Sequence, residues 1–515
     1  MHQALQNLEV ISTISSYVEH RSLPALASTC RAFAHPALNA LWRDLQSAKP
    51  LVKCLPSDLF GVDRGGSAVL RKPLDDRMWH TLFKYTSRVH SIIVSDDTEV
   101  NGPLCLLAIN ISCFSAPESL FPNLHRLKLR ASGTLCAAEV LRMAFVPSLV
   151  ELNMEISSAS FAYLSVLSSL GTFCPHLQNM TMNFGFSSDT SSPKVSPFIT
   201  RSISQLHHLR TLSVSDLGVQ GIKHLTELPT LQSLSLHLTM LSAWETKSDS
   251  SFPGFHNLHF LGLFTLTIKQ ASNFLNSLQF VESKEIEIKV DLTFAFDDEC
   301  TSMPEFFAIV REKCDNTKLE SISFHGLCSK QSHTRLRGVF TPLYACCNLT
   351  RLLIGDLCYI SMSDEELGQL AKAWPKLQVL QIKCYASENT TIPTFHGLIN
   401  LLRRCPALTS LALVINVTQL NGIDLKSPGG GCSNQRLTSF ALGRSLIQAP
   451  VDVALITSGL FPNLKKVDFW DTSLPKLQPR KEWLKQQLER WELVNKIIGG
   501  FSLVKERCIE TWSDR

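Results

Sequence analysis

Charged residues are scarce in this sequence of 515 residues. Asp, Glu, Lys and Arg together make up 18% of the chain, and the formal net charge is only +4. Hydrophobic residues reach 44%, which is enough for a large buried core and is inconsistent with wholesale disorder. Because no dense run of Lys or Arg occurs either, we expect no nucleic-acid partner.

Long apolar runs are also missing. No stretch approaches the roughly 18 uninterrupted apolar residues of a membrane-spanning helix, so we expect no membrane partner. The first residues, MHQALQNLEVISTISSYVEH, lack the basic segment, apolar stretch and small-residue cleavage site of a secretory signal. We therefore expect a cytoplasmic and/or nuclear protein that keeps its 16 cysteines as thiols.

The motifs of common catalytic and metal sites are absent as well. There is no His-Glu-x-x-His, no Gly-x-Ser-x-Gly and no Gly-x-Gly-x-x-Gly, and the triple glycine at residues 429–431 lacks the Lys and Ser/Thr of a phosphate loop. No Cys-x-x-Cys pair occurs. We expect no catalytic residue, no metal and no cofactor, although a triad built from distant residues would leave no such pattern.

What the sequence does contain is a recurring Leu-x-x-Leu-x-Leu phrase. The clearest copies are FPNLHRLKL (residues 121–129) and CPALTSLAL (residues 405–413). Looser copies begin at Val89, Leu149, Leu177, Leu209, Leu231, Leu258, Leu319, Leu349, Leu377, Leu437 and Leu464, and a degenerate copy, SKEIEIKV, begins at Ser283. The spacing averages about 29 residues, which is typical of the longer leucine-rich repeats. The alternating apolar positions predict one short strand per phrase.

Stretches with helical spacing lie between the phrases, for example at residues 304–314, 363–374 and 394–405. Ser363 and Glu366 form a capping-box pattern at the start of one of them. A strand–helix unit cannot bury its apolar face alone, so neighbouring units stack. We predict an α/β leucine-rich-repeat solenoid, a horseshoe with parallel strands on the concave side and helices on the convex side. A doubly wound α/β domain is the alternative, but one recurring phrase favours the solenoid.

Two details of the repeats carry further expectations. The leucine-rich-repeat family usually has Asn after the strand, whereas this chain has Ser132, Ser157, Leu217, Leu357 and Thr472. An irregular solenoid follows from that departure. Cysteines directly before a strand phrase are expected to be small buried residues of the repeat core, namely Cys174, Cys347 and Cys405.

The hydrophobic period changes in the first fifty residues. Val10, Ile14 and Tyr17 are spaced for one helix face, and two further helices are predicted, the third starting at Pro36. Three short helices enclose a very small core. They expose apolar surface unless something covers it.

The segments LEVISTISSYV (residues 8–18), RSLPALASTCRAF (21–33) and HPALNALWRDL (35–45) resemble the F-box of fungal F-box/leucine-rich-repeat proteins. The resemblance continues through residues 51–56 and 79–92, but Gln6 and Asn7 stand where the family usually opens with Leu-Pro. It implies a non-catalytic substrate receptor of an SCF-type cullin–RING ubiquitin ligase. The F-box would bind a Skp-type adaptor, and through it a cullin, while the repeats bind a target protein.

By the family's pattern, eight residues would supply the F-box core or the adaptor-facing contacts: Leu8, Val10, Ile11, Ile14, Leu23, Leu26, Leu41 and Trp42. The sequence does not divide them between these roles. The alternative is a non-ligase interaction scaffold whose N-terminal helices only cap the solenoid. The expected division of the chain is an F-box-like domain at 1–47, a helical linker at 48–87, irregular repeats at 88–475 and a capping helix at 476–515.

The residues between the strand leucines should line the concave face, because side chains alternate along a strand. Candidates for target binding are Arg126, Lys128, Arg130, Phe260, Phe264 and Trp470. Glu151 and Glu155 follow on the next strand and are expected to neutralise the three basic residues. Neutral polar groups with scattered aromatics suit a protein or peptide ligand. The alternative is a solvated face without a dedicated site.

Overall fold

The computed structural model describes residues 7–56, 58–62, 68–96, 106, 109, 119–131, 135–156, 161–184, 196–238, 252–291, 299–326, 335–355, 359–383, 391–443, 445–468 and 481–513. The chain divides into two compact units, Met1–Leu234 and Ser235–Arg515, and the division falls within strand β9 (Ser233–His237). We describe each unit by itself.

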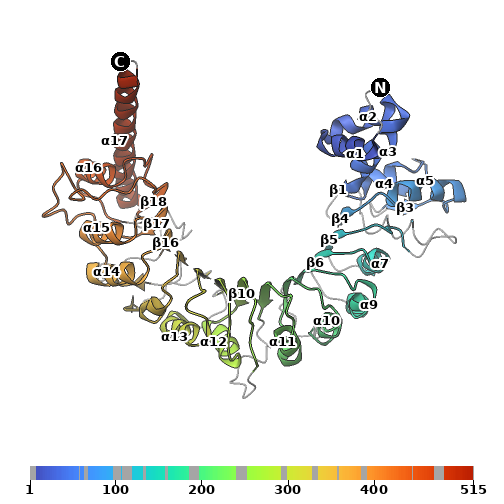
Figure 1. Cartoon of the computed structure of the whole chain (residues 1–515), viewed down its shortest axis with the longest axis horizontal. Coiled ribbons are helices and arrows are strands. Elements are labelled where there is room, and N and C mark those ends of the chain that lie inside the picture. Colours follow the sequence, from blue (N-terminus) through green and yellow to red (C-terminus); the bar gives the residue numbers. More distant parts are fainter. Residues whose placement is uncertain are drawn as a thin grey trace. The chain divides into compact units, whose positions relative to one another are not determined.

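The N-terminal unit opens with helices and continues with strand–helix repeats (Figure 1). Its elements are α1 (Leu8–Tyr17), the 3-10 helix η2 (His20–Ser22), α2 (Leu23–Thr29), α3 (Arg31–Arg43), β1 (Asp44–Leu45), α4 (Lys49–Lys53), β2 (Phe60–Val62), β3 (Ala68–Leu70), α5 (Asp76–Thr86), β4 (Ser91–Ser95), β5 (Arg126–Ala131), α7 (Leu135–Ala144), β6 (Glu151–Ile156), α8 (Phe161–Leu167), α9 (Leu170–Phe173), β7 (Asn179–Phe184), α10 (Ser196–Ile203), β8 (Thr211–Ser215) and α11 (Gly218–Thr226). The strand order β1-β4-β5-β6-β7-β8 forms a parallel sheet.

The C-terminal unit consists of further repeats and one long helix. Its elements after β9 are β10 (Phe260–Thr265), α12 (Ile268–Ser277), β11 (Glu285–Val290), the 3-10 helix η4 (Glu299–Ser302), α13 (Met303–Lys313), β12 (Ser321–Gly326), β13 (Arg335–Leu336), the 3-10 helix η5 (Thr341–Ala345), β14 (Arg351–Ile354), β15 (Tyr359–Ile360), α14 (Asp364–Ala373), β16 (Val379–Ile382), α15 (Phe395–Arg404), β17 (Ser410–Leu413), β18 (Ser439–Ala441), α16 (Pro450–Leu460) and α17 (Lys481–Ser513). The strands pair in parallel in the order β10-β11-β12-β14-β16-β17-β18.

In each unit the repeat helices lie along one side of the sheet, and the other side is left open (Figure 1). We call that side the open face. The predicted leucine-rich-repeat solenoid of parallel strands and helices is therefore confirmed, and the doubly wound alternative, which needs helices on both faces, is wrong. None of the described helices combines the length and apolarity needed to span a bilayer.

The strand phrases fold as their alternation predicts. In β5, Leu127 and Leu129 are buried against the helices, whereas Arg126 and Arg130 are exposed on the open face. The register places Leu127 beside Leu152 of β6, so that buried leucines stack from repeat to repeat. The last phrase differs, because its described part, residues 464–468, forms a single bridge, between Ala441 and Asp468.

Polar side chains in the turns before the strands link successive repeats. The Ser148 hydroxyl donates to the carbonyls of Pro122 and Leu124, and the Thr230 hydroxyl donates to those of His207 and Leu209. In the C-terminal unit the Nδ2 amides of Asn348, Asn434 and Asn463 donate to the previous repeat in the same way. Each such bond contributes about 1 kcal/mol. These hydrogen bonds join successive repeats before each strand begins, whereas the family's usual Asn follows the strand.

Two local expectations are wrong. The third helix begins at Arg31 and not at Pro36, because Pro36 fits inside α3 with the loss of one backbone hydrogen bond. Cys347 is exposed, and its neighbour Cys346 takes the buried position. Cys174 and Cys405 are buried as predicted, and burial raises the pKa of the Cys174 thiol to about 12 and that of Cys405 to about 11. These two thiols are therefore packing residues.

Candidate functional site

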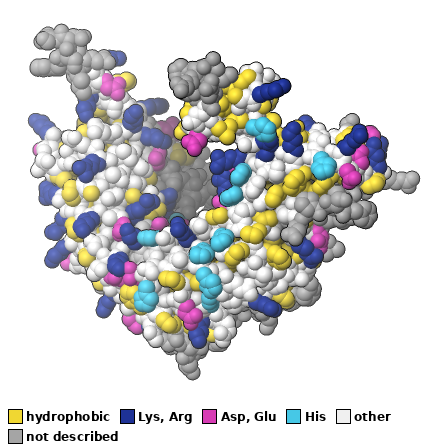
Figure 2. Space-filling view, turned by 45° about the vertical axis from the view of Figure 1, so that its right-hand side comes forward, with side chains coloured by type: hydrophobic (Ala, Val, Ile, Leu, Met, Phe, Trp, Pro, Cys, Tyr) yellow, Lys and Arg dark blue, Asp and Glu magenta, His cyan; other side chains and the backbone are white. Residues whose placement is uncertain are grey.

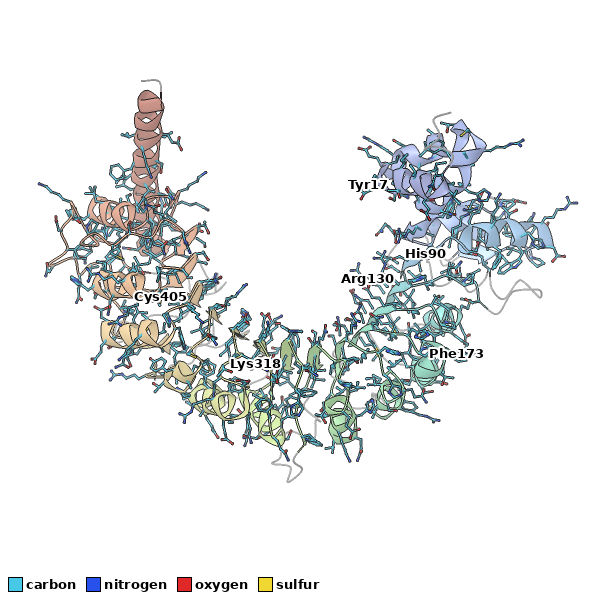
Figure 3. The ribbon with its side chains drawn as sticks, viewed as in Figure 1. Tyr17, His90, Arg130, Phe173, Lys318 and Cys405 are labelled. Carbon is cyan, nitrogen blue, oxygen red and sulfur yellow. The ribbon has the colours of Figure 1, made fainter. Side chains whose placement is uncertain are left out.

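The first candidate surface is an apolar stripe on α1. Val10, Ile14 and Tyr17, which we call the α1 stripe, lie on one helix face and are 36%, 38% and 87% exposed. Ile11 and Ser15 turn toward the core on another face of the helix. Figure 3 shows Tyr17 at the edge of the helical head, and Figure 2 shows hydrophobic side chains gathered on that part of the surface. Val10 and Ile14 are therefore partly covered by the described residues, whereas Tyr17 is almost uncovered.

The structure divides the eight F-box candidates into three groups. Leu8, Val10 and Ile14 are exposed, Ile11 and Leu23 are buried in the core, and Leu26, Leu41 and Trp42 are partly exposed. Asn7, at the position of the family's proline, caps α1 instead, because its Oδ1 accepts a hydrogen bond from the Glu9 backbone N–H (2.8 Å). This hydrogen bond satisfies a backbone N–H in the first turn of α1, where a proline would instead fix the backbone angle φ.

Trp42 belongs to the connection between the head and the repeats. Its ring stacks on Tyr85 of α5 at a centroid distance of 4.6 Å. Helix α3 then continues directly into β1, whose Asp44 pairs with Ser91 of β4. Truncation of Trp42 would disturb this connection. A loss of partner binding by such a variant would therefore not distinguish a lost contact from a disturbed structure.

The covering of the first strands is provided by other elements. α1 and α2 pack on α3, whereas α4 and α5 contact each other, and α5 lies on the same side of the sheet as the repeat helices (Figure 1). The apolar side chains of this covering layer, Leu51, Trp79 and Leu82, are buried. A helix that served only as a cap would bury its apolar face against the solenoid. The α1 stripe does not do so.

The second candidate surface is the open face of the N-terminal unit, which brings Arg126, Lys128 and Arg130 together on β5. All three form ion pairs: Arg126 with Asp44 (2.6 Å), and Lys128 and Arg130 with Glu155 (3.2 and 2.8 Å). Partial burial opposes ionisation of Glu155, but hydrogen bonds from these two bases lower the pKa of its carboxyl below the ordinary value. Because all partners are substantially exposed, each pair contributes about 0–1 kcal/mol.

Two histidines that the motif search passed over lie at the edge of this face. The Nδ1 atoms of His90 and His125 are 3.3 Å apart, and the His125 Nδ1 is 2.7 Å from the carbonyl of Asn123. Burial lowers the pKa of His90, and the nearby His125 and Arg43 lower it further. Among the described residues, no three His, Cys, Asp or Glu side chains are grouped so that they could hold a metal ion.

The open face of the C-terminal unit places Phe260 and Phe264 on β10, both partly exposed. The Phe264 ring is stacked on the His237 ring (4.3 Å between centroids, 7° between planes), and the Lys289 Nζ lies 4.7 Å from the Phe264 centroid. Lys289 is also 2.9 Å from Glu287. Burial, and then the Lys289 charge, lower the pKa of His237.

The sequence pattern predicts which residues lie beside Phe260 and Phe264. The degenerate phrase SKEIEIKV forms β11, and its alternation places Glu285, Glu287 and Lys289 on the open face beside Phe260 and Phe264. The last predicted candidate, Trp470, lies outside the described residues.

No protein-family model matches this sequence, and no curated protein matches it. Among solved structures, an internalin from Listeria monocytogenes matches with a TM-score of 0.35 and 15% identity, over 76% of this chain and 89% of the internalin chain. A chain of the Rad7 and Elc1 complex from yeast matches with a TM-score of 0.31 and 14% identity, over 75% of this chain and 92% of that chain. We assign the leucine-rich-repeat fold from the strand and helix order, and we transfer no function from these matches.

Proposed function

We propose that this protein is a non-catalytic substrate receptor of an SCF-type cullin–RING ubiquitin ligase, acting in the cytoplasm and/or nucleus. In this proposal the α1 stripe is part of the surface that binds a Skp-type adaptor, and the adaptor connects the chain to a cullin. The open face of the repeats binds a target protein. The proposal combines the F-box resemblance of residues 8–45 with the leucine-rich-repeat fold.

The observation that carries this proposal is the exposure of the α1 stripe. Three apolar side chains at helical spacing face solvent on a head whose own core is already formed by Ile11, Leu23 and Ala37. Because α4 and α5 cover the first strands, the stripe is not needed as a cap. Exposed apolar surface of this kind is typical of a protein-interaction site.

Titration calorimetry with a purified Skp-type adaptor tests the proposal. We expect the wild-type chain to bind, and the triple variant Val10→Ser, Ile14→Ser, Tyr17→Ser to lose affinity by about 100-fold or more, because three buried apolar contacts would be worth at least about 3 kcal/mol. The control is Ser12→Ala with Ser16→Ala, two exposed positions on the opposite side of α1.

Thermal melts followed by circular dichroism show whether the triple variant is folded. Tyr17 is 87% exposed and Val10 and Ile14 are each more than a third exposed, so the triple variant should stay folded with a modest loss of stability. If the wild type did not bind under conditions in which a control F-box protein binds the same adaptor, the scaffold alternative would replace the ligase proposal.

A further inference from the structure

One row of side chains crosses four adjacent strands on the open face of the C-terminal unit. The register of β10, β11, β12 and β14 aligns Phe260, Glu285, Ser321 and Arg351. We call these four residues the Glu285–Arg351 row. Because adjacent strands are about 4.8 Å apart, the backbones of Glu285 and Arg351 are separated by about 10 Å.

Glu285 and Arg351 differ from the other charges nearby because no ion pair joins either of them to a described residue. The lysines on either side of Glu285 in the sequence pair with other acids: Lys284 with Glu320 (3.6 Å) and Lys289 with Glu287 (2.9 Å). Among the described residues, the Glu285 carboxylate accepts only a long hydrogen bond, from the Ser321 hydroxyl (3.5 Å). The row therefore presents one negative and one positive group that are available to a partner.

Small residues lie between the two charges. Ser321 and its neighbour on the same face, Ser323, are only 6% and 7% exposed, so the strand between Glu285 and Arg351 adds almost no polar surface of its own. In the N-terminal unit Asp44 and Arg126 pair across Ser91 of the intervening strand. Glu285 and Arg351 do not form the corresponding pair, so both remain available to a partner.

Phe260 is the aromatic member of the row, and its backbone is the register partner of Glu285 on the neighbouring strand. A Cβ atom at Gly262 would lie 2.9 Å from the Phe260 ring, so the ring leans along the strand over Gly262, toward the side of Glu287. An aromatic ring next to a carboxylate is suited to a guanidinium or ammonium group, which is attracted to the ring quadrupole and pairs with the carboxylate.

We propose that the Glu285–Arg351 row recognises a target segment through two side chains of opposite charge. An Arg or Lys of the segment pairs with Glu285 against the Phe260 ring, and an Asp or Glu about 10 Å away pairs with Arg351. The identity of this segment as a ligase target rests on the proposed function, whereas its binding requires only the repeats. The charge pattern favours a peptide that carries both a positive and a negative side chain over a polyanion or a purely apolar segment.

Selection from a random-sequence peptide library on the purified full-length chain, without adaptor, tests this proposal. Wild type is expected to enrich peptides that carry one basic and one acidic residue at a fixed spacing. The charge-swap variant Glu285→Arg with Arg351→Glu keeps the net charge and should enrich the same spacing with the signs exchanged. Fluorescence anisotropy with one selected peptide should then show that Glu285→Gln lowers the affinity about tenfold.

The matched control is Glu151→Gln, because Glu151 is also an exposed acid on the open face but belongs to the N-terminal unit. It should leave the affinity for the selected peptide unchanged. The proposal is overturned if the library enriches no charged pair, or if the charge-swap variant enriches the same sequences as wild type. Since no adaptor is present, either outcome is independent of whether the α1 stripe binds one.

Discussion

The open faces of the two units are built from the same strand phrase but use their charges differently. In the N-terminal unit, Lys128 and Arg130 of β5 pair with Glu155 on the adjacent strand β6, and Arg126 pairs with Asp44 of β1, two strands away across Ser91. In the C-terminal unit, Glu285 and Arg351 are separated by the serine-bearing strand β12 and do not pair. The same two-strand separation across a serine is therefore bridged by Asp44 and Arg126 in the N-terminal unit and left open by Glu285 and Arg351 in the C-terminal unit.

The largest effect is expected from breaking the C-terminal unit itself. Trp374 is fully buried there, and its Nε1–H donates to the carbonyl of Leu343 (3.2 Å). Trp374→Ala should lower the free energy of unfolding of that unit by about 3–5 kcal/mol. Thermal unfolding should show the loss, and peptide binding should fall while adaptor binding persists. Equal loss of both activities would mean that the two surfaces are not energetically separate.

A smaller effect is expected from giving the C-terminal face the internal pairing of the N-terminal one. Ser321→Lys places an ammonium group beside Glu285, where the Ser321 hydroxyl is now 3.5 Å from the carboxylate. The internal ion pair should lower the affinity for a selected peptide by about tenfold. Anisotropy measures the affinity. An unchanged affinity would show that Glu285 does not contact the peptide.

The smallest effect is expected in the pH dependence of stability. The pKa of His237 is lowered by burial and by Lys289, and Glu287 is the neighbouring acid. The unfolded chain therefore takes up a proton at this residue before the folded chain does, and stability is lost as the pH falls below about 6.5. His237→Phe keeps an aromatic ring against Phe264 and removes the proton. Urea unfolding at neutral and mildly acidic pH should show a shallower decline for the variant; an identical decline would exclude this contribution.

The local rules that the sequence obeys explain how much of the fold could be predicted. Alternating leucines specify the buried side of each strand wherever it lies, and the capping box is also local: the Glu366 N–H donates to Ser363 Oγ (3.2 Å), and the Ser363 N–H donates to Glu366 Oε2 (2.7 Å). The sequence places the start of α3 at Pro36 instead of Arg31, because proline favours the first turn of a helix. Inside a helix Pro36 forgoes one hydrogen bond, and packing of the neighbouring Ala37 in the head core offsets that loss.

The candidate sites depended on contacts between residues far apart in the sequence. The spacing of Val10, Ile14 and Tyr17 was readable, but their exposure follows from α4 and α5 covering the first strands. Glu285 and Arg351 are 66 residues apart, and no ion pair joins either to a described residue, whereas Lys284 and Lys289 pair with Glu320 and Glu287. A sequence pattern does not specify which of several nearby charges will pair.

The division of labour between the head and the repeats is tested most directly by one calorimetric titration of a Skp-type adaptor into two full-length variants. The account predicts that the α1-stripe variant, Val10→Ser with Ile14→Ser and Tyr17→Ser, loses the binding heat, while the charge-swap variant, Glu285→Arg with Arg351→Glu, binds the adaptor like wild type. Undiminished binding by a folded α1-stripe variant would contradict it.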